Sequence, residues 1–258
     1  MFKIDNSIKL FVFDLDDTLY RGDFVFPYAV DLVKHLQKDY EVIFLTNNST
    51  KPVIDICNKL NDKGFECSPE KVYTSSLLTI MYCQEYDIND IYVIGNTSIV
   101  EEFRKFGLKV IQDETAKHVV VANDLNFNYD KITTAINIIN KGGKFIACNQ
   151  DGNFKHSEDW ILPGCGAMVG AISYASNSFP DVVVGKPNSY GIKTICIDWW
   201  VKKSEVVVVG DLWDIDIKMA LDFGSKAILI DDELTTKNKN LLIFKSIEEI
   251  YKYCKGEL

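Results

Sequence analysis

Leu10-Phe11-Val12-Phe13-Asp14-Leu15-Asp16-Asp17-Thr18 is the stretch that decides the fold, because four apolar residues run directly into an acidic turn. A short apolar run that ends in polar residues is typical of a buried strand. The pattern recurs where Val42–Leu45 leads into Thr46 and where 205–209 leads into Gly210-Asp211. Segments of helical period separate these runs, so the sequence predicts an α/β protein with a parallel sheet covered on both faces.

The middle of the chain repeats this alternation on a smaller scale. Apolar runs at 91–94, 119–121 and 145–147 alternate with helical patterns near 99–106 and 129–141. About a hundred residues with their own alternation suffice for a separate small domain. We therefore expect a core formed by residues 1–78 and 181–258, with a smaller α/β domain inserted at 79–180. A short strand and a closing helix are expected between Leu241 and Tyr253.

Composition and charge disfavour several classes of protein. The chain has 28 Lys and Arg and 37 Asp and Glu, which gives a net charge of -9. A protein with this charge repels a long nucleic acid. No stretch approaches the about 20 apolar residues of a membrane helix, and no secretory signal is recognisable. The seven cysteines are scattered without a C-x-x-C pair, which is typical of free thiols in a reducing, cytoplasmic compartment. The three histidines lack zinc-ligand spacing.

Four polar clusters follow apolar strands, and in an open parallel sheet ligands bind beyond the carboxyl ends of the strands. Each cluster alone could simply form a turn or cap a helix. Together, the carboxylates of the first and last cluster would repel one another by about 4 kcal/mol per close pair at an effective dielectric constant near 20. A cation must therefore lie among them. The clusters are Asp14–Thr18, Thr46-Asn47-Asn48, Gly185-Lys186-Pro187 and Gly210–Asp216.

A hard divalent cation such as Mg²⁺ suits this set of oxygen ligands, and it commonly accompanies a substrate phosphate. The chemistry indicated is phosphoryl transfer. One carboxylate can attack phosphorus to form an aspartyl phosphate, and a second, two residues on, can exchange protons with the leaving oxygen and with water. A lysine would neutralise charge on the phosphoryl oxygens.

The order D-x-D-x-T, strand-end Thr, Lys and G-D-x-x-x-x-D resembles the haloacid dehalogenase-like (HAD) phosphatase superfamily. Finer matches are similar to its NagD or p-nitrophenyl phosphatase branch, which carries a large inserted α/β (C2-type) cap. The resemblance runs from about Phe11 to Ile230 and implies a Rossmann-like doubly wound core with residues 79–180 as the cap. The matching segments are 14–22, 45–49, 74–76, 92–95, 162–164, 185–187 and 210–217.

The resemblance also implies roles for individual residues. Asp14 would be the nucleophile and Asp16 the general acid and base. Thr46, with backbone groups of Asn47 and Asn48, would hold the phosphoryl group, whose charge Lys186 would stabilise. Mg²⁺ would be bound by the Asp14 and Asp211 carboxylates and the Asp16 carbonyl, with Asp216 behind these ligands.

Three segments depart from the family pattern. Asp17 stands where the branch usually has Gly, and we expect its side chain to face away from the metal. Leu212-Trp213 replaces the usual Arg-Leu and removes a positive charge. In the expected cap, 147–151 resembles an A-T-N-P-D segment, and we expect residues 152–156 after it to form a loop. Asn149, Asp151 and Phe154 are candidates for substrate contact there, although Asn149 and Asp151 could instead merely build the turn.

The sequence therefore predicts a Mg²⁺-dependent phosphatase for small monoesters, such as sugar phosphates, phosphoglycolate, pyridoxal phosphate or p-nitrophenyl phosphate. Its partner would be a small phosphorylated metabolite, and pairing through caps makes a homodimer an expectation. A phosphotransferase or phosphomutase on the same scaffold stays open, as does an idle sensor that binds a phosphorylated ligand. A dehalogenase is disfavoured, because displacing a halide needs no second acid such as Asp16.

Overall fold

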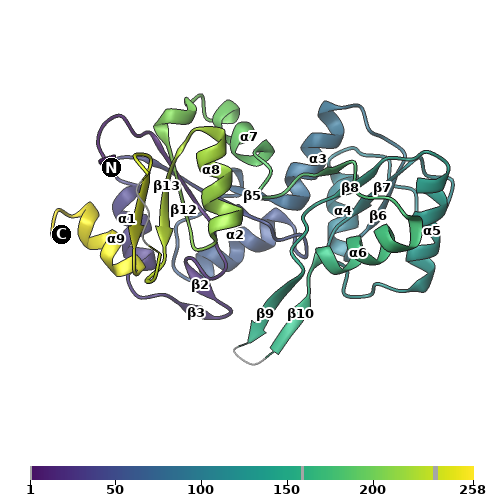
Figure 1. Cartoon of the computed structure of the whole chain (residues 1–258), viewed down its shortest axis with the longest axis horizontal. Coiled ribbons are helices and arrows are strands. Elements are labelled where there is room, and N and C mark those ends of the chain that lie inside the picture. The colour runs from purple at the N-terminus through teal and green to yellow at the C-terminus, as the bar shows by residue number, and fades with distance from the viewer. Residues whose placement is uncertain (1, 158–159, 235–237) are drawn as a thin grey trace. The chain divides into compact units, whose positions relative to one another are not determined.

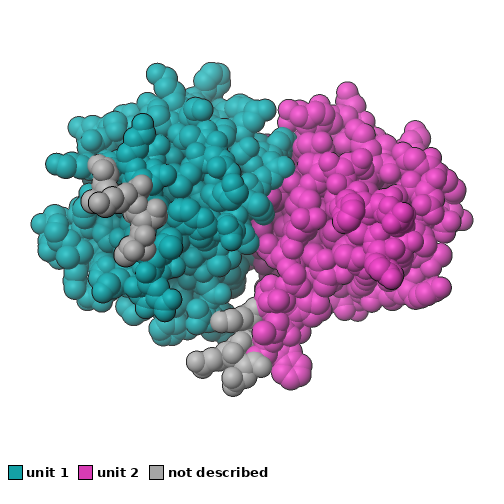
Figure 2. Space-filling view, viewed as in Figure 1, with its two compact units in different colours: residues 1–46, 56–73, 186–258 teal, residues 47–55, 74–185 magenta. Residues whose placement is uncertain are grey.

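The computed structural model describes residues 2–157, 160–234 and 238–258. By their internal contacts these residues form two compact units, coloured separately in Figure 2. Unit 1 comprises residues 1–46, 56–73 and 186–258, and unit 2 comprises residues 47–55 and 74–185. The chain therefore leaves unit 1 and returns to it twice.

Unit 1 is built on a six-stranded sheet (Figure 1). In spatial order its strands are β14 (Leu241–Phe244), β13 (Lys226–Ile230), β12 (Val206–Gly210), β1 (Leu10–Phe13), β4 (Glu41–Thr46) and β5 (Val72–Thr74). The pairs from β14 to β4 are parallel. The chain builds outward from β1 through β4 to β5, then resumes on the other side at β12. The strand order therefore reverses between β1 and β12, which is where open α/β sheets bind ligands.

Helices pack on this sheet through apolar stripes. In α1 (Ala29–Leu36), the buried residues recur at the i, i+3, i+4, i+7 spacing of one helix face; they are Ala29, Leu32, Val33 and Leu36. The other helices of unit 1 are α7 (Tyr190–Asp198), α8 (Lys218–Phe223), α9 (Ile247–Cys254) and residues 56–62 of α2 (Val53–Asp62). A small hairpin, β2 (Tyr20–Arg21) and β3 (Phe24–Val25), follows the first strand. The predicted α/β class, with its doubly wound parallel core, is confirmed.

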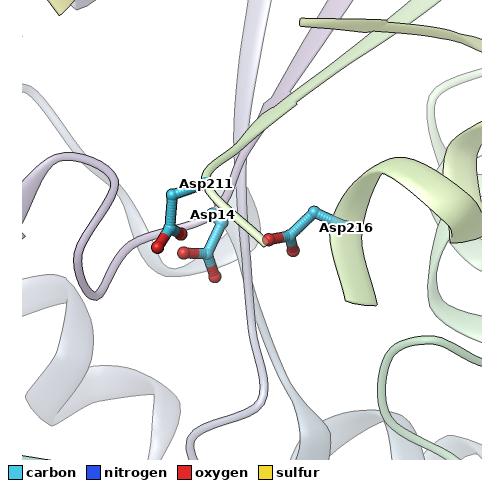
Figure 3. Close-up of side chains that lie close together, drawn as sticks. All are labelled: Asp14, Asp211 and Asp216. Carbon is cyan, nitrogen blue, oxygen red and sulfur yellow. The ribbon is translucent and has the colours of Figure 1, made fainter. Parts of the chain in front are cut away.

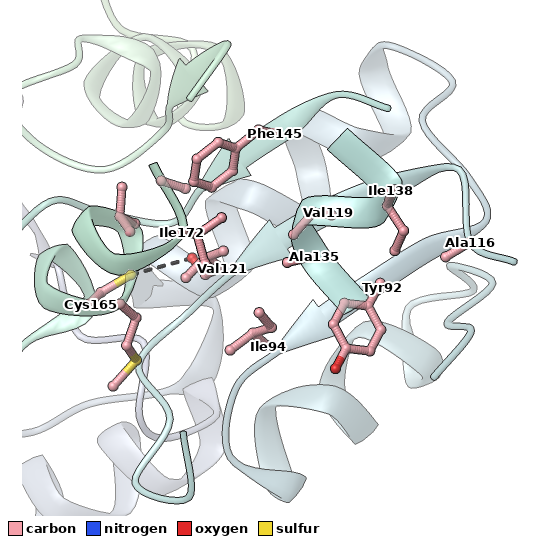
Figure 4. Packing of buried hydrophobic residues seen from close by; sticks show 13 residues of the cluster. Tyr92, Ile94, Ala116, Val119, Val121, Ala135, Ile138, Phe145, Cys165 and Ile172 are labelled. Atoms are coloured by element: carbon pink, nitrogen blue, oxygen red, sulfur yellow. Dashed lines mark hydrogen bonds between the residues drawn. The ribbon is translucent and has the colours of Figure 1, made fainter. Parts of the chain in front are cut away.

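Unit 2 has its own four-stranded parallel sheet, in the order β11 (Val182–Val183), β8 (Phe145–Ala147), β7 (His118–Val121) and β6 (Ile91–Ile94). Its helices are α3 (Ser75–Glu85), α4 (Thr97–Lys105), α5 (Tyr129–Asn140) and α6 (Cys165–Ser176). Figure 4 shows the apolar core, where Val121, Phe145 and Ile172 pack together and Cys165 Sγ donates to the Val121 carbonyl at 3.3 Å.

Two segments differ from the sequence expectation. We expected the run from Val182 among the core residues, but β11 pairs with β8 in the sheet of unit 2. We expected a loop after Gly152, but the chain forms an antiparallel hairpin of β9 (Asn153–Ser157) and β10 (Trp160–Pro163). Among the residues that the structure describes, no helix is both long and apolar enough to cross a bilayer.

Candidate active site

Two acidic loops meet where the strand order of unit 1 reverses. In the parallel register Phe13 lies beside Val209, and the Asp14 amide donates to the Val209 carbonyl at 2.9 Å. Asp14 therefore leaves β1 at the level where β12 runs into Gly210 and Asp211. A Cβ on Gly210 would lie 2.5 Å from the Asp216 Cβ, so only glycine lets Asp216 approach the strand end.

Three carboxylates converge there, from Asp14, Asp211 and Asp216. One oxygen of each lies within 4.8 Å of the others, and Figure 3 shows the side chains directed toward a common point. Asp216 comes from the short π-helix Trp213–Ile217 and is 1% exposed. The carboxylates that the sequence placed together in the first and last clusters are therefore brought together.

Lys186 supplies one positive charge to this cluster. Its Nζ lies 2.5 Å from Asp14 Oδ1 and 2.6 Å from Asp216 Oδ1, and the side chain is 4% exposed. Burial alone would lower the pKa of Lys186, but the two carboxylates outweigh that effect and raise it. The ammonium group therefore stays protonated, and it ties Asp14 to Asp216.

Thr18 bridges the other side of the cluster. Its Oγ1 lies 3.0 Å from Asp14 Oδ2 and 2.9 Å from Asp211 Oδ1. A hydroxyl has one proton to donate, so it can satisfy only one of the two carboxylates at a time. Burial raises the pKa of Asp211 to about 6, and the charge of Asp14 adds to the rise. A second positive charge would relieve this crowding.

The site fits a hard divalent cation on these grounds. Three ionised carboxylates and one ammonium (three negative charges against one positive) leave two negative charges in a largely buried cluster. All the donors are oxygens, which Mg²⁺ prefers. Asp14 and Asp211 compete for the single hydroxyl proton of Thr18, and so each retains lone pairs for a cation.

Asp16 lies just outside the cluster. Its side chain is 55% exposed, and Lys59 Nζ on α2 lies 3.8 Å from its Oδ1. Although part of the side chain is exposed, the protein packed around it removes enough water to raise the pKa of Asp16 to about 6, while Lys59 opposes the rise and Asp14 adds to it. A pKa near the working pH suits a group that both gives and takes a proton.

Asp17 follows in a left-handed conformation with φ of 63°. This backbone favours glycine, which explains the usual Gly of the branch at this position. The Asp17 side chain pairs with Arg21 and does not join the carboxylates of the cluster. The Asp17 carboxylate, which this chain has in place of the usual glycine, therefore pairs with Arg21.

The second polar cluster divides between the units. Thr46 ends β4 in unit 1 and is 3% exposed, whereas Asn47 and Asn48 begin a segment of unit 2. Asn48 Oδ1 accepts from the amides of Thr50 and Lys51 at 2.9 and 3.2 Å. This side chain therefore shapes the turn after the strand.

The candidates for substrate contact lie in unit 2. Asn149 is 3% exposed and its Nδ2 donates to the Asn47 carbonyl at 2.7 Å. Its Oδ1 accepts from the Asp151 amide at 3.1 Å, and Asp151 Oδ1 accepts from Asn47 Nδ2 at 3.1 Å. Phe154 lies on β9 and is 36% exposed. Asn149 and Asp151 thus tie their turn to the segment after Thr46, while Phe154 remains at the surface.

Sequence reasoning gave no role to two residues of the site, Thr18 and Lys59. Thr18 was part of the quoted motif, four residues after Asp14, so its place could have been found. Lys59 gave no signal, because a lysine on a helix is ordinarily solvated. Leu212 and Trp213 stay 49% and 37% exposed beside Asp211.

Comparison with known proteins shows the family of the chain. Residues 11–109 match a family model described as haloacid dehalogenase-like hydrolase, and residues 183–246 match one described as HAD-hydrolase-like. An acid sugar phosphatase of Staphylococcus epidermidis is 30% identical over 230 residues, 88% of each chain.

Solved structures of similar proteins share the whole fold. A 4-nitrophenylphosphatase of Thermotoga maritima, 27% identical, superposes with a TM-score of 0.87 over 95% of this chain and 97% of its own. A protein described as NagD, 25% identical, reaches 0.88 over 96% and 99%. Family models, a curated relative and solved structures therefore show that the chain belongs to the haloacid dehalogenase-like hydrolases, among the phosphatases of the NagD and p-nitrophenyl phosphatase type.

Proposed function

We propose that this protein is a Mg²⁺-dependent phosphatase that hydrolyses small phosphate monoesters through an aspartyl phosphate on Asp14. The observation that carries the proposal is the contact of Lys186 with both Asp14 and Asp216, beside Asp211. A carboxylate 12% exposed and held by an ammonium at 2.5 Å is fixed in place, as a nucleophile must be.

In the first half of the reaction an oxygen of Asp14 attacks phosphorus. A bond forms between this oxygen and phosphorus, and the ester P–O bond breaks. Its electron pair goes to the leaving oxygen, which takes a proton from Asp16. Lys186 offsets negative charge on the phosphoryl oxygens, and Thr46, with backbone groups of Asn47 and Asn48, orients the phosphoryl group.

In the second half a water molecule attacks the same phosphorus. Asp16, now ionised, accepts a proton from the water, and the bond between phosphorus and the Asp14 oxygen breaks. Inorganic phosphate leaves, Asp14 recovers its carboxylate and Asp16 its proton. The two carboxylates thus divide the nucleophilic and the acid–base work.

The metal would be held by the Asp14 and Asp211 carboxylates and by the Asp16 backbone carbonyl, with Asp216 fixed behind them by Lys186. When bound, Mg²⁺ supplies positive charge that offsets the charge of the phosphoryl group. Thr18 keeps Asp14 and Asp211 side by side, and so holds the two carboxylates in position for a shared ion.

The names of the relatives indicate the substrate class. We propose small monoesters of the sugar phosphate type, with p-nitrophenyl phosphate as an artificial substrate. Residues 79–180, within unit 2, would act as the cap that reads the leaving group, with Asn149, Asp151 and Phe154 as candidates. Seven free cysteines support a cytoplasmic location, and a homodimer stays a prediction.

The test is release of phosphate from a panel of sugar phosphates, phosphoglycolate, pyridoxal phosphate and p-nitrophenyl phosphate by the purified protein with Mg²⁺. We expect turnover that EDTA abolishes and added Mg²⁺ restores, and none from Asp14→Asn. If no ester of the panel is hydrolysed, the proposal fails. Transfer to an added acceptor alcohol would show a phosphotransferase, and a ligand-induced rise in Tm without turnover would show an idle binding protein.

A further inference from the structure

A second lysine of unit 1 lies beside the acid–base carboxylate. Lys59 projects from α2 and its Nζ is 3.8 Å from Asp16 Oδ1. The same Nζ lies 4.2 Å from the centroid of the Tyr20 ring, and 30% of the side chain is exposed. The ammonium group therefore contacts a carboxylate and an aromatic face at once.

Tyr20 restrains the position of the Lys59 ammonium group. The residue is 1% exposed, and its carbonyl accepts from the Asp17 amide at 2.8 Å. The backbones of Asp16 and Tyr20 also pair in an isolated β-bridge, so the two residues belong to one closed turn. A cation held over a buried aromatic ring is more restrained than one in solvent. The position of Lys59 relative to Asp16 is set by this turn.

The two lysines contact different carboxylates. Lys186 contacts Asp14 and Asp216, the proposed nucleophile and the carboxylate behind it. Lys59 contacts Asp16 and is not part of the acidic cluster. A carboxyl group exchanges a proton through one oxygen, so a contact with Oδ1 can restrain the group while the other oxygen carries the proton.

We propose that Lys59 is a positioning residue, which holds the Asp16 carboxyl group where it can protonate the leaving oxygen. This inference rests on the proposed function. It concerns one step, in which the ester P–O bond breaks, its electron pair goes to the leaving oxygen, and the proton of Asp16 moves to that oxygen. Lys59 itself bonds to nothing in that step and transfers no proton.

The leaving group distinguishes positioning from a structural role. An alkyl oxygen, as in a sugar phosphate, is a poor leaving group and needs the proton as the bond breaks. A p-nitrophenolate leaves as a stable anion and needs none. Loss of positioning should therefore slow cleavage of the alkyl ester and spare the aryl ester, whereas a general loss of structure would slow both.

The experiment compares kcat/KM for p-nitrophenyl phosphate and for the best alkyl ester of the panel. For Lys59→Met we expect about a tenfold or larger loss on the alkyl ester, a part of the roughly 10²- to 10⁴-fold that acid–base catalysis supplies, and less than about a twofold change on the aryl ester. Lys59→Arg should restore most of the loss. The ratio of kcat/KM for the alkyl ester to kcat/KM for the aryl ester reports on the chemical step. Tm, measured on the same variants, reports on stability.

Lys63→Met is the matched control. Lys63 lies one helical turn on, with its Nζ 5.1 Å from the same ring, but it pairs with Asp23 at 3.9 Å and should leave the ratio unchanged. Should Lys59→Met fold poorly, Lys59→Gln takes its place. Equal losses on both esters, or no loss on either, would overturn the positioning role of Lys59 and leave the proposed function standing. A wild-type protein inactive on both esters would overturn the proposed function as well.

Discussion

Each unit holds a lysine that pairs with a buried aspartate beyond a strand of its parallel sheet. In unit 2, Lys131 Nζ lies 2.5 Å from Asp124 Oδ2, and Asp124 follows β7. In unit 1, Lys186 Nζ lies 2.6 Å from Asp216 Oδ1, and Asp216 follows β12. Both aspartates are 1% exposed at the side chain. The interaction is the same, and its surroundings decide what it can do.

The pair of unit 2 is complete in itself. Asp124 Oδ1 accepts from the Asn126 amide at 2.9 Å, and Lys131 also donates to the Asn126 carbonyl at 3.3 Å. One positive charge meets one negative charge within eight residues of sequence. In unit 1 the lysine meets two carboxylates, with Asp211 close by. A balanced local pair serves the fold, whereas an excess of carboxylates gathered from distant segments attracts a cation.

Removing the charge of Lys186 should have the largest effect. In Lys186→Met the buried Asp14 and Asp216 lose their ammonium partner, and charge on the phosphoryl group is no longer offset. We expect kcat to fall by about 10²- to 10³-fold, the usual cost of removing one electrostatic stabiliser. Phosphate release at saturating substrate measures this. Activity within about threefold of wild type would contradict the role given to Lys186.

Lys131→Met removes the lysine of the Lys131–Asp124 pair in unit 2, as Lys186→Met does in unit 1. We expect this variant to lose stability and to keep its catalytic activity. Removing one partner strands the buried Asp124 carboxylate, but Lys131 itself is 28% exposed. We therefore expect the free energy of unfolding to fall by up to about 3 kcal/mol, at or below the usual range for a fully buried pair. Urea unfolding gives this value, and kcat below the transition should stay within about twofold. A large loss of kcat would mean that the two pairs do not differ as described.

Asn149→Ala tests whether the polar residues of unit 2 bind substrate or hold the fold. The variant removes the amide donor of the Asn47 carbonyl, which keeps its hydrogen bond from Ser75 Oγ at 2.7 Å, and the side-chain acceptor of the Asp151 amide. We expect a loss of about 1 to 2 kcal/mol in stability, the usual net contribution of one or two intramolecular hydrogen bonds. KM for the alkyl and aryl esters, measured beside urea unfolding, decides the question. A rise in KM confined to one ester, at unchanged stability, would instead support substrate contact.

Glu102 should give the smallest effect, in the pH dependence of stability. It is 7% exposed, and it accepts from the Val53 amide at 2.9 Å and from Ser76 Oγ at 3.1 Å. Burial raises the pKa of Glu102 despite these hydrogen bonds. The folded protein therefore holds this proton more tightly than the unfolded chain, whose glutamates titrate near pH 4.3. Stability from this group is present below that pH and is lost as pH rises through the folded-state pKa.

The measurement is urea unfolding of wild type and Glu102→Gln from pH 4.5 to 8. The stability of wild type relative to the variant should decline with rising pH and then level off. The variant also loses a hydrogen-bond acceptor, which adds an offset independent of pH. A difference that grows with pH would mean that the ionised carboxylate is the form that the fold prefers.

Much of the fold follows from the sequence, since apolar runs such as Leu10–Phe13 and Val206–Val209 are too short for helices and are rich in aromatic or β-branched residues. The gathering of Asp14 and Asp211 follows from the ends of two neighbouring parallel strands meeting at one edge, whereas Lys186 follows a strand of the other sheet. The sheet to which Val182–Val183 belongs could not be predicted, because a short buried strand looks alike in either sheet. Nor could the hairpin after Gly152, since Asn153–Ser157 shows no alternation of apolar and polar residues.

Side chains that reach the site from another element were the hardest to predict. Lys59 approaches Asp16 from a helix, and nothing in its local sequence distinguishes it from a solvated lysine. Conversely, Asp124 and Asn149 follow strands as Asp14 does, yet their polar atoms are satisfied by neighbours. A polar residue at a strand end is a candidate site residue. Only its contacts in the structure show whether its polar atoms remain available to bind a ligand.

The central claim is that Asp14 becomes esterified to phosphorus, and trapping that ester tests it most directly. Asp16→Asn should still accept the phosphoryl group from p-nitrophenyl phosphate, because that leaving group needs no acid, but should release it slowly to water. After an acid quench, mass spectrometry should find one phosphoryl group on the peptide that contains Asp14, and none in Asp14→Asn. A burst of p-nitrophenolate with no label on that peptide, or label on another residue, would contradict the account.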